Sequence, residues 1–152
     1  AAKALEEGLG GRTDFVHKMN ALAKDLGMTD TMFDNSAGFD SDRNFSTPYD
    51  LVLLSRHIIF NEPEIMDIVS SDKLSIESND GHGWFGPQNM NRLITEYEGS
   101  IGLKTGETDA AGLSLLAAAK RKGTVMVAVV LSSDNHFADA RRLLDYGFDQ
   151  SQ

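Results

Sequence analysis

Apolar residues recur every three to four positions through residues 14–26, which is the spacing of one buried face of an amphipathic helix. Thr13 stands where an N-cap is expected, and Gly27 stands where a glycine commonly ends a helix. Residues 1–7 have the composition of a helix interior, with no capping residue before them. We therefore expect two helices, and we expect the sequence to begin in the middle of a folded domain.

Residues 28–45 are rich in Thr, Asp, Asn, Ser and Gly, which predicts a long ordered loop. A helix start follows, because Thr47 can cap, Pro48 suits the first helical position, and Asp50 lies three residues after the cap. The buried face of this helix is predicted to consist of Leu51, Leu54, Ile58 and Ile59.

The pattern changes after Gly99. Two apolar runs, residues 113–119 and 125–131, are joined by a polar connection at 120–123 that contains a glycine, which predicts a β-hairpin. Together with the short apolar segment 101–104, these runs predict three successive strands in an antiparallel meander.

A closing helix is predicted over residues 137–146, with Gly147 as its terminator. Its apolar positions recur at helical spacing and are expected to be buried. These positions are Phe137, Ala140, Leu143 and Leu144.

Between the helices and the strands, residues 61–91 give mixed signals, with a short hairpin predicted around residues 79–81. Helices that precede a meander indicate an α/β (α+β) fold, in which an antiparallel sheet is flanked by helices. We expect one domain, with residues 1–100 forming a mostly helical subdomain and residues 101–152 supplying three strands of the sheet and the closing helix.

Composition narrows the function. The 152 residues carry a formal net charge of −9, which argues against nucleic acid as a partner, because phosphate binding needs a basic face. The absence of cysteine excludes disulfides and thiolate metal sites. The four histidines lack metal-ligand spacing to one another, so we expect no metal site and no cofactor.

The strongest chemical signal is the triplet Lys104–Thr105–Gly106, which follows a short apolar strand and precedes a second apolar run. A lysine ammonium and a threonine hydroxyl together can hold a substrate carboxylate. A glycine beside them leaves room for a peptide that lies along the strand. The same triplet also occurs by chance in ordinary strands, so its context decides its meaning.

That context resembles the low-molecular-mass penicillin-binding proteins, the serine-type D-alanyl-D-alanine carboxypeptidases. Six blocks follow in the order found in that family and cover essentially the whole chain. They are residues 15–20 with 23–28, residues 31–35 with 38–39, and residues 46–51, 89–93, 102–106 and 143–148. The resemblance implies the penicillin-binding protein or serine β-lactamase fold, and an extracytoplasmic location in the periplasm or on the outer face of the cell membrane.

The resemblance also implies roles in catalysis and substrate binding. Lys104 and Thr105 would bind the carboxylate of a peptidoglycan stem peptide ending in D-Ala-D-Ala, or the carboxylate of a β-lactam, and Gly106 would permit close approach. The backbone N–H of Glu107 would be one of two oxyanion donors. Thr108 would support the end of the strand at the substrate site.

His136 stands where some family members have an arginine that reaches the substrate carboxylate, and Met90 likewise stands where some relatives have an arginine. Histidine is shorter than arginine and only partly charged near neutral pH. The resemblance therefore includes His136 among the substrate-binding residues and makes the strength of that contact an open question.

The family's reaction needs two further motifs, a Ser-x-x-Lys with the nucleophile and a Ser-x-Asn, and both are expected before Ala1. Two segments within the chain imitate them. Ser70 and Lys73 have the Ser-x-x-Lys spacing, but Ser70 lies in no convincing helix. Ser133 begins a Ser-Asp-Asn triplet, but it follows Lys104 in the chain, whereas the family's Ser-x-Asn motif precedes the Lys-Thr-Gly triplet. Ser133 more plausibly lies in the turn that caps the final helix. We expect neither serine to be the nucleophile.

Three functions remain open from sequence alone. The first is the C-terminal part of a D-Ala-D-Ala carboxypeptidase, inactive without the preceding segment; the second is a β-lactamase or DD-endopeptidase of the same fold; the third is a peptidoglycan-binding module without a nucleophile. We also expect the chain to be stable only with a companion that covers the apolar face of the sheet, either the N-terminal fragment of the same protein or a second copy exchanging elements.

Overall fold

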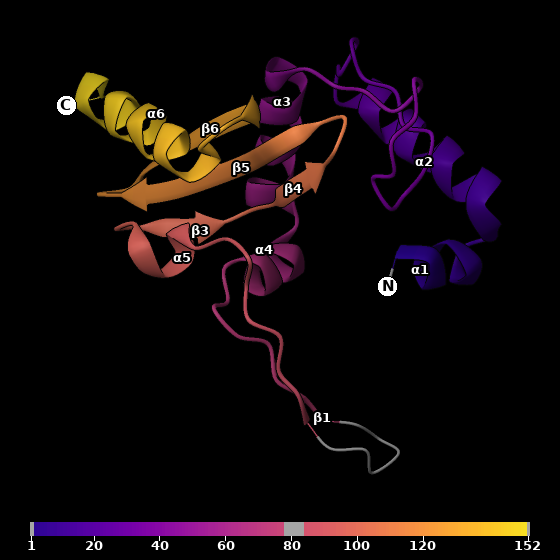
Figure 1. The fold of residues 1–152 in the computed structure, drawn as a ribbon, viewed down its shortest axis with the longest axis horizontal. Coiled ribbons are helices and arrows are strands. Elements are labelled where there is room, and N and C mark those ends of the chain that lie inside the picture. Colours follow the sequence, from indigo (N-terminus) through magenta and orange to yellow (C-terminus); the bar gives the residue numbers. More distant parts are fainter. Residues whose placement is uncertain (1, 78–83, 152) are drawn as a thin grey trace.

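The computed structural model describes residues 2–77 and 84–151, and it places a pair of helices to one side of a sheet that has further helices packed against it (Figure 1). The paired helices are α1 (Ala2–Gly8) and α2 (Gly11–Asp25). Gly10 adopts φ 103° and turns the chain directly from α1 into α2, so the prediction that Thr13 caps this helix was wrong. Gly27, with φ 79°, ends the helix as predicted.

The start of α3 (Pro48–Asn61) confirms the predicted capping, because the hydroxyl of Thr47 accepts a hydrogen bond from the Asp50 backbone N–H at 3.2 Å. The Asp50 carboxylate is buried and accepts from the Thr31 hydroxyl at 2.7 Å and from the Asp30 N–H at 2.9 Å, so it fastens the preceding loop to the helix. The predicted apolar face of α3 is only half-buried, since the described residues cover it incompletely.

Four antiparallel strands make the main sheet, with β5 as its centre. β3 and β4 both pair with one side of β5, and β6 pairs with the other side. The strands are β3 (Ser100–Gly102), β4 (Thr105–Thr108), β5 (Gly112–Arg121) and β6 (Thr124–Ser133). The predicted single strand over residues 101–104 was therefore wrong, because positive φ angles at Gly102 and Leu103 break it and a new strand begins at Thr105.

The segment between α3 and the sheet contains α4 (Pro63–Val69), a short hairpin and α5 (Leu93–Glu96). The strands of the hairpin are β1 (Ile76–Glu77) and β2 (Trp84–Phe85), which pair antiparallel as expected. The predicted turn near residues 79–81 lies outside the described residues.

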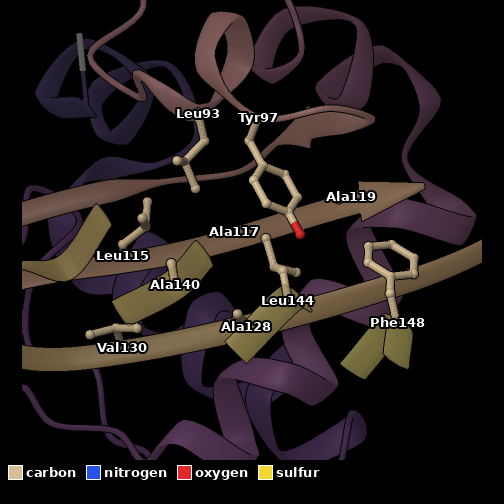
Figure 2. Close-up of a cluster of buried hydrophobic side chains, with 10 residues drawn as sticks. All are labelled: Leu93, Tyr97, Leu115, Ala117, Ala119, Ala128, Val130, Ala140, Leu144 and Phe148. Carbon is tan, nitrogen blue, oxygen red and sulfur yellow. The ribbon is translucent and has the colours of Figure 1, made fainter. Parts of the chain in front are cut away.

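α6 (His136–Gln150) covers one face of β5 and β6, and α3 packs against β6 and passes behind the sheet (Figure 1). Alternate residues of the two strands point at α6 and form the main core with it, as expected from the two-residue period of a strand (Figure 2). Many of these residues are alanine, which lets the helix lie close to the sheet. The core consists of Leu93, Tyr97, Leu115, Ala117, Ala119, Ala128, Val130, Ala140, Leu144 and Phe148.

α6 is longer than predicted, because Gly147 lies inside it rather than at its end. A Cβ at Gly147 would lie 3.1 Å from the Met126 sulfur, so the missing side chain allows the helix to pack on β6. Leu143, predicted to be buried, is 48% exposed, and the extra turn brings Phe148 into the core instead.

Tyr97 closes one end of this core, and its hydroxyl donates to the Asp145 carboxylate at 2.7 Å. Burial, followed by this hydrogen bond, raises the pKa of Tyr97 from its ordinary value of 10.0 to about 12. Arg121 lies over the Tyr97 ring at 4.6 Å and over the Phe148 ring at 4.7 Å, which secures the same corner.

We expect the free energy of unfolding to fall as the pH rises from 10 to about 12, because the unfolded chain loses the Tyr97 proton in that range while the folded chain keeps it. The loss is at most about 2.7 kcal/mol for this group. Urea unfolding of the chain together with its expected N-terminal companion, across the pH range, measures the loss, with Tyr97→Phe as the reference. Equal pH dependence in the two proteins would contradict the raised pKa.

Candidate functional site

The break between β3 and β4 determines where Lys104 points. Leu103 has φ 86° and is buried, so the next residue is directed to the exposed side of the sheet. The Lys104 backbone is still paired with β5, because its N–H donates to the Leu116 carbonyl at 3.1 Å and its carbonyl accepts from the Leu116 N–H at 2.9 Å. The register shift of β3 lies just before the break, between Ser100 and Gly102. Across the break the pairing with β5 stays in step, from Gly102 opposite Ala118 to Thr105 opposite Leu115, so the strand is not released.

A cavity of about 740 Å³ lies over β4. Every residue that the sequence assigned to the site lines this cavity, from Lys104 to Thr108 and at His136, so the structure brings all six together. The other walls come from distant parts of the chain. They are formed by Ser36, Ala37, Gly38, Met90, Ala111, Leu113, Ser114 and Phe137.

The triplet presents its polar groups to this cavity. The Lys104 side chain is exposed, and its ammonium donates to the Thr105 carbonyl. Within residues 2–77 and 84–151, the Thr105 hydroxyl has no hydrogen-bond partner, so it is available to a ligand.

The fold itself does not require a glycine at position 106. Its φ is not positive, and no protein atom beyond its chain neighbours lies within 4 Å of the position that a Cβ would take. The missing side chain therefore leaves space in the cavity and relieves no crowding within the protein. Gly102 is the opposite case, because a Cβ there would lie 2.3 Å from the Val69 carbonyl oxygen.

Glu107 and Thr108 differ in how far they are engaged. The Glu107 side chain is exposed to solvent. The Thr108 hydroxyl donates to the Asp40 carboxylate at 2.6 Å and accepts from the Ala111 N–H at 3.0 Å. The hydroxyl that the family resemblance placed at the substrate is thus already used by the protein.

His136 is half-buried at the first position of α6, where the Asn135 side chain caps the helix by accepting from the Ala138 N–H. The His136 ring lies 4.1 Å from the Phe137 ring. The Arg92 guanidinium lies over the same Phe137 ring at 4.5 Å. The cavity therefore has the positive end of a helix dipole on one side and Lys104 on another, which favours an anionic ligand.

Met90 is presented to the cavity by anchored neighbours. The Asn89 side chain donates to the carbonyls of Val69 and Ser71 at 3.1 and 3.0 Å, and Asn91 is almost fully buried. Met90 between them is 77% exposed. It gives this wall an apolar surface where an arginine would have given it a charge.

The two segments whose sequences resemble the Ser-x-x-Lys and Ser-x-Asn motifs do not line the cavity. Ser70 is the C-cap of α4, and neither it nor Lys73 is among the lining residues. The Ser133 hydroxyl donates to the Asp139 carboxylate at 2.6 Å and accepts from the Asn135 N–H at 2.9 Å, so it supports the start of α6, whose N-cap is Asn135.

Sequence reasoning missed the wall made by Ser36, Ala37 and Gly38. These residues lie in the loop between α2 and α3, far from the triplet along the chain. The only signal was Gly38, whose φ of 77° marks a turn, but nothing in the pattern indicated what that turn approaches. Ser114 was missed as well: it pairs with Gly106 in the ladder of β4 and β5, but the predicted strand ended at residue 104.

Comparison with known proteins shows the family of the chain. The family model described as D-alanyl-D-alanine carboxypeptidase matches residues 1–135. The D-alanyl-D-alanine carboxypeptidase DacD of Salmonella typhimurium is 38% identical over 144 residues, which cover 91% of this chain and 35% of the relative. DacF of Bacillus subtilis is 32% identical over 154 residues, covering 99% of this chain and 39% of the relative.

Solved structures give the same result. Penicillin-binding protein D2 of Listeria monocytogenes, solved with cefotaxime bound, superposes with a TM-score of 0.85 and 34% identity, over 97% of this chain and 60% of that one. This confirms the penicillin-binding protein fold expected from the sequence. The chain spans about a third of the length of the DacD relative and somewhat more of DacF. With a family match over most of its residues, and with the Lys-Thr-Gly strand lining the cavity, the chain belongs to the D-alanyl-D-alanine carboxypeptidase family.

Proposed function

We propose that this chain supplies the carboxylate-binding side of the active site in a serine-type D-alanyl-D-alanine carboxypeptidase. The observation that carries the proposal is the cavity above β4. There the Lys104 ammonium and the Thr105 hydroxyl, which has no partner among the described residues, lie beside the open space at Gly106. A peptide ending in a free carboxylate fits these groups, because ammonium and hydroxyl donors satisfy its charge while the glycine leaves room for its backbone.

In the proposed reaction, a serine hydroxyl attacks the carbonyl carbon of the penultimate D-Ala of a peptidoglycan stem peptide. The peptide bond breaks, D-alanine leaves with the transferred proton, and water then hydrolyses the acyl-serine ester. Lys104 and Thr105 hold the terminal carboxylate. The Glu107 N–H lies next to the triplet on β4 and serves as one donor to the oxyanion. A β-lactam enters the same site and acylates the same serine.

We assign the serine and its activating lysine to a segment that precedes this chain. Ser70 and Ser133 lie outside the cavity, and the carboxypeptidase relatives extend well beyond the matched part. Within the described residues, no helix is both long enough and apolar enough to cross a membrane. We place the reaction outside the cytoplasmic membrane, where peptidoglycan is exposed.

Fluorescent penicillin labelling tests the proposal in the complete protein, meaning this chain together with the segment that carries Ser-x-x-Lys. A carboxypeptidase becomes labelled and releases D-alanine from a D-Ala-D-Ala peptide. A β-lactamase instead turns over the penicillin rapidly, a DD-endopeptidase cleaves cross-linked peptide, and a binding module gives no label. Labelling without release of D-alanine would overturn the carboxypeptidase assignment.

The surface of the chain supports a companion. Among the described residues, sixteen large apolar side chains are exposed, and twelve of them lie before residue 78, with Tyr49 at 70% and Phe60 at 67%. β6 is ten residues long, carries no charged side chain, and pairs only with β5 among the described strands. Uncharged edge strands of this length readily accept another strand.

We therefore expect this chain, purified alone at micromolar concentration, to aggregate or bind a hydrophobic dye, and to remain unlabelled by penicillin. Addition of the N-terminal segment should reduce dye binding and restore labelling. A soluble, unlabelled dimer of the chain alone would instead identify a second copy as the companion. Size-exclusion chromatography with dye fluorescence measures this. A monodisperse monomer that unfolds cooperatively would refute the need for a companion.

We expect His136→Arg in the complete protein to preserve or increase the release of D-alanine from peptides with a free terminal carboxylate. An arginine at the N-terminal end of α6 adds a permanent charge and two parallel donors beside the cavity. The gain should disappear with an amidated peptide, which serves as the control. Strong inhibition by the substitution would mean that His136 packs on Phe137 for a structural reason and does not serve the carboxylate.

A further inference from the structure

The helical N-terminal part of the chain is joined to the sheet by very few direct polar contacts. α1 and α2 stand to one side of the sheet, and the loop that leaves α2 reaches toward the end of β4 (Figure 1). Among the described residues, the hydrogen bond from the Thr108 hydroxyl to the Asp40 carboxylate is the only one between residues 2–47 and residues 84–151. It spans 68 positions along the chain at 2.6 Å.

The loop that carries Asp40 is stiffened by its own side chains. Asn35 is buried, and its amide bonds both the N–H and the carbonyl of Phe39 at 2.9 Å. The Asp34 carboxylate accepts from the Ser41 hydroxyl at 2.8 Å and from Arg43 at 3.0 Å. The loop therefore moves as one unit, and a contact at Asp40 also fixes the residues just before it.

Those preceding residues are the cavity wall. Ser36 and Gly38 face the cavity from the loop, while Gly106 faces it from β4. Thr108 lies two residues after Gly106 on the same strand. The Asp40–Thr108 bond thus joins the two walls of the cavity at its rim, and an oxygen–oxygen distance of 2.6 Å leaves little freedom in their separation.

We propose that Asp40 and Thr108 form a latch that sets the distance between the loop wall and the Lys-Thr-Gly strand, and that both are positioning residues for substrate capture. The inference rests on the proposed function for its catalytic consequence. The latch holds residues 36–38 against one flank of a peptide that lies along β4. Its loss lets the loop move outward, so that the carboxylate still meets Lys104 but the peptide is held less firmly.

The test uses the complete protein and a fluorescent penicillin. Asp40→Ala should lower the second-order acylation rate constant about tenfold, a change of about 1.4 kcal/mol. The half-saturating penicillin concentration should rise, and the limiting rate of acylation should change less. Asp40→Asn keeps an acceptor for the Thr108 hydroxyl and should recover most of the activity. Asp42→Ala removes the same charge from the same exposed loop and should react like the wild type.

A double-mutant cycle separates the latch from general damage. Thr108→Val should act like Asp40→Ala, with an additional effect from the lost contact to the Ala111 N–H, and the double variant should be no slower than Thr108→Val alone. Multiplied losses in the double variant, or an Asp40→Ala protein that reacts like Asp42→Ala, would overturn the latch.

Amide hydrogen exchange distinguishes failure of the latch from failure of the proposed function. Exchange at residues 36–38 should be faster in Asp40→Ala than in Asp42→Ala, whether or not the protein reacts with penicillin. Unchanged exchange would refute the latch. Faster exchange in a protein that never becomes labelled would support the latch and reject the carboxypeptidase function.

Discussion

Lys104→Ala in the complete protein is expected to slow acylation by penicillin about 10²- to 10³-fold, the range found when one preorganised hydrogen-bond donor is removed from an active site. The side chain is exposed, and among the described residues its ammonium hydrogen-bonds only to the neighbouring Thr105 carbonyl, so its removal should leave the fold intact. Stopped-flow labelling gives the rate, and the thermal unfolding midpoint should stay within the error of the wild type.

Matched variants make this result specific. Lys120→Ala removes an exposed lysine from the neighbouring strand β5 and should not slow acylation. Ser70→Ala and Ser133→Ala should also acylate at nearly the normal rate, since neither residue lines the cavity. A full-rate Lys104→Ala protein would remove the triplet from the active site, and loss of labelling in either serine variant would identify a nucleophile or proton relay within this chain.

Gly102→Ala is expected to have the largest effect on stability, at least about 3 kcal/mol. Gly102 has φ 102°, which is strained for any residue with a side chain, and a Cβ would lie 2.3 Å from the Val69 carbonyl oxygen. Either β3 or the end of α4 must move. Denaturant unfolding of the complete protein measures the loss.

Gly106→Ala is the control for this prediction, because the position has no positive φ and no atom near a new Cβ. It should cost little stability and should instead weaken acylation, since the methyl group enters the cavity. Equal stability loss in the two variants would show that the crowding at Gly102 is not what limits the substitution.

Local signals in the sequence determined much of this protein. The Thr47 cap, the Pro48 position and the Gly27 terminator depend only on neighbouring residues, and each was found where predicted. The apolar runs of β5 and β6 could be predicted for the same reason, because a two-residue or continuous apolar pattern records burial directly. The triplet at Lys104 and the order of the six blocks were enough to indicate the family.

Tertiary contacts decided the positions where the local prediction was wrong. Gly147 looks like a helix terminator, but it packs against Met126 inside α6, and the helix continues to Gln150. The apolar run before Lys104 looks like a continuous strand, but the close approach of α4 requires a backbone at Gly102 that only glycine adopts easily.

The candidate site likewise contains residues that the sequence indicated and residues that only the tertiary structure placed there. Residues 104–108 are contiguous, so their chemistry is visible in the sequence as soon as the triplet is noticed. Ser36, Gly38 and Asp40 join them only because the loop after α2 folds across to β4, and a contact over 68 positions leaves no local periodicity or spacing to detect. The sequence by itself therefore determined that the polar groups of residues 104–108 lie next to one another, and the tertiary structure decided which wall of the cavity faces them.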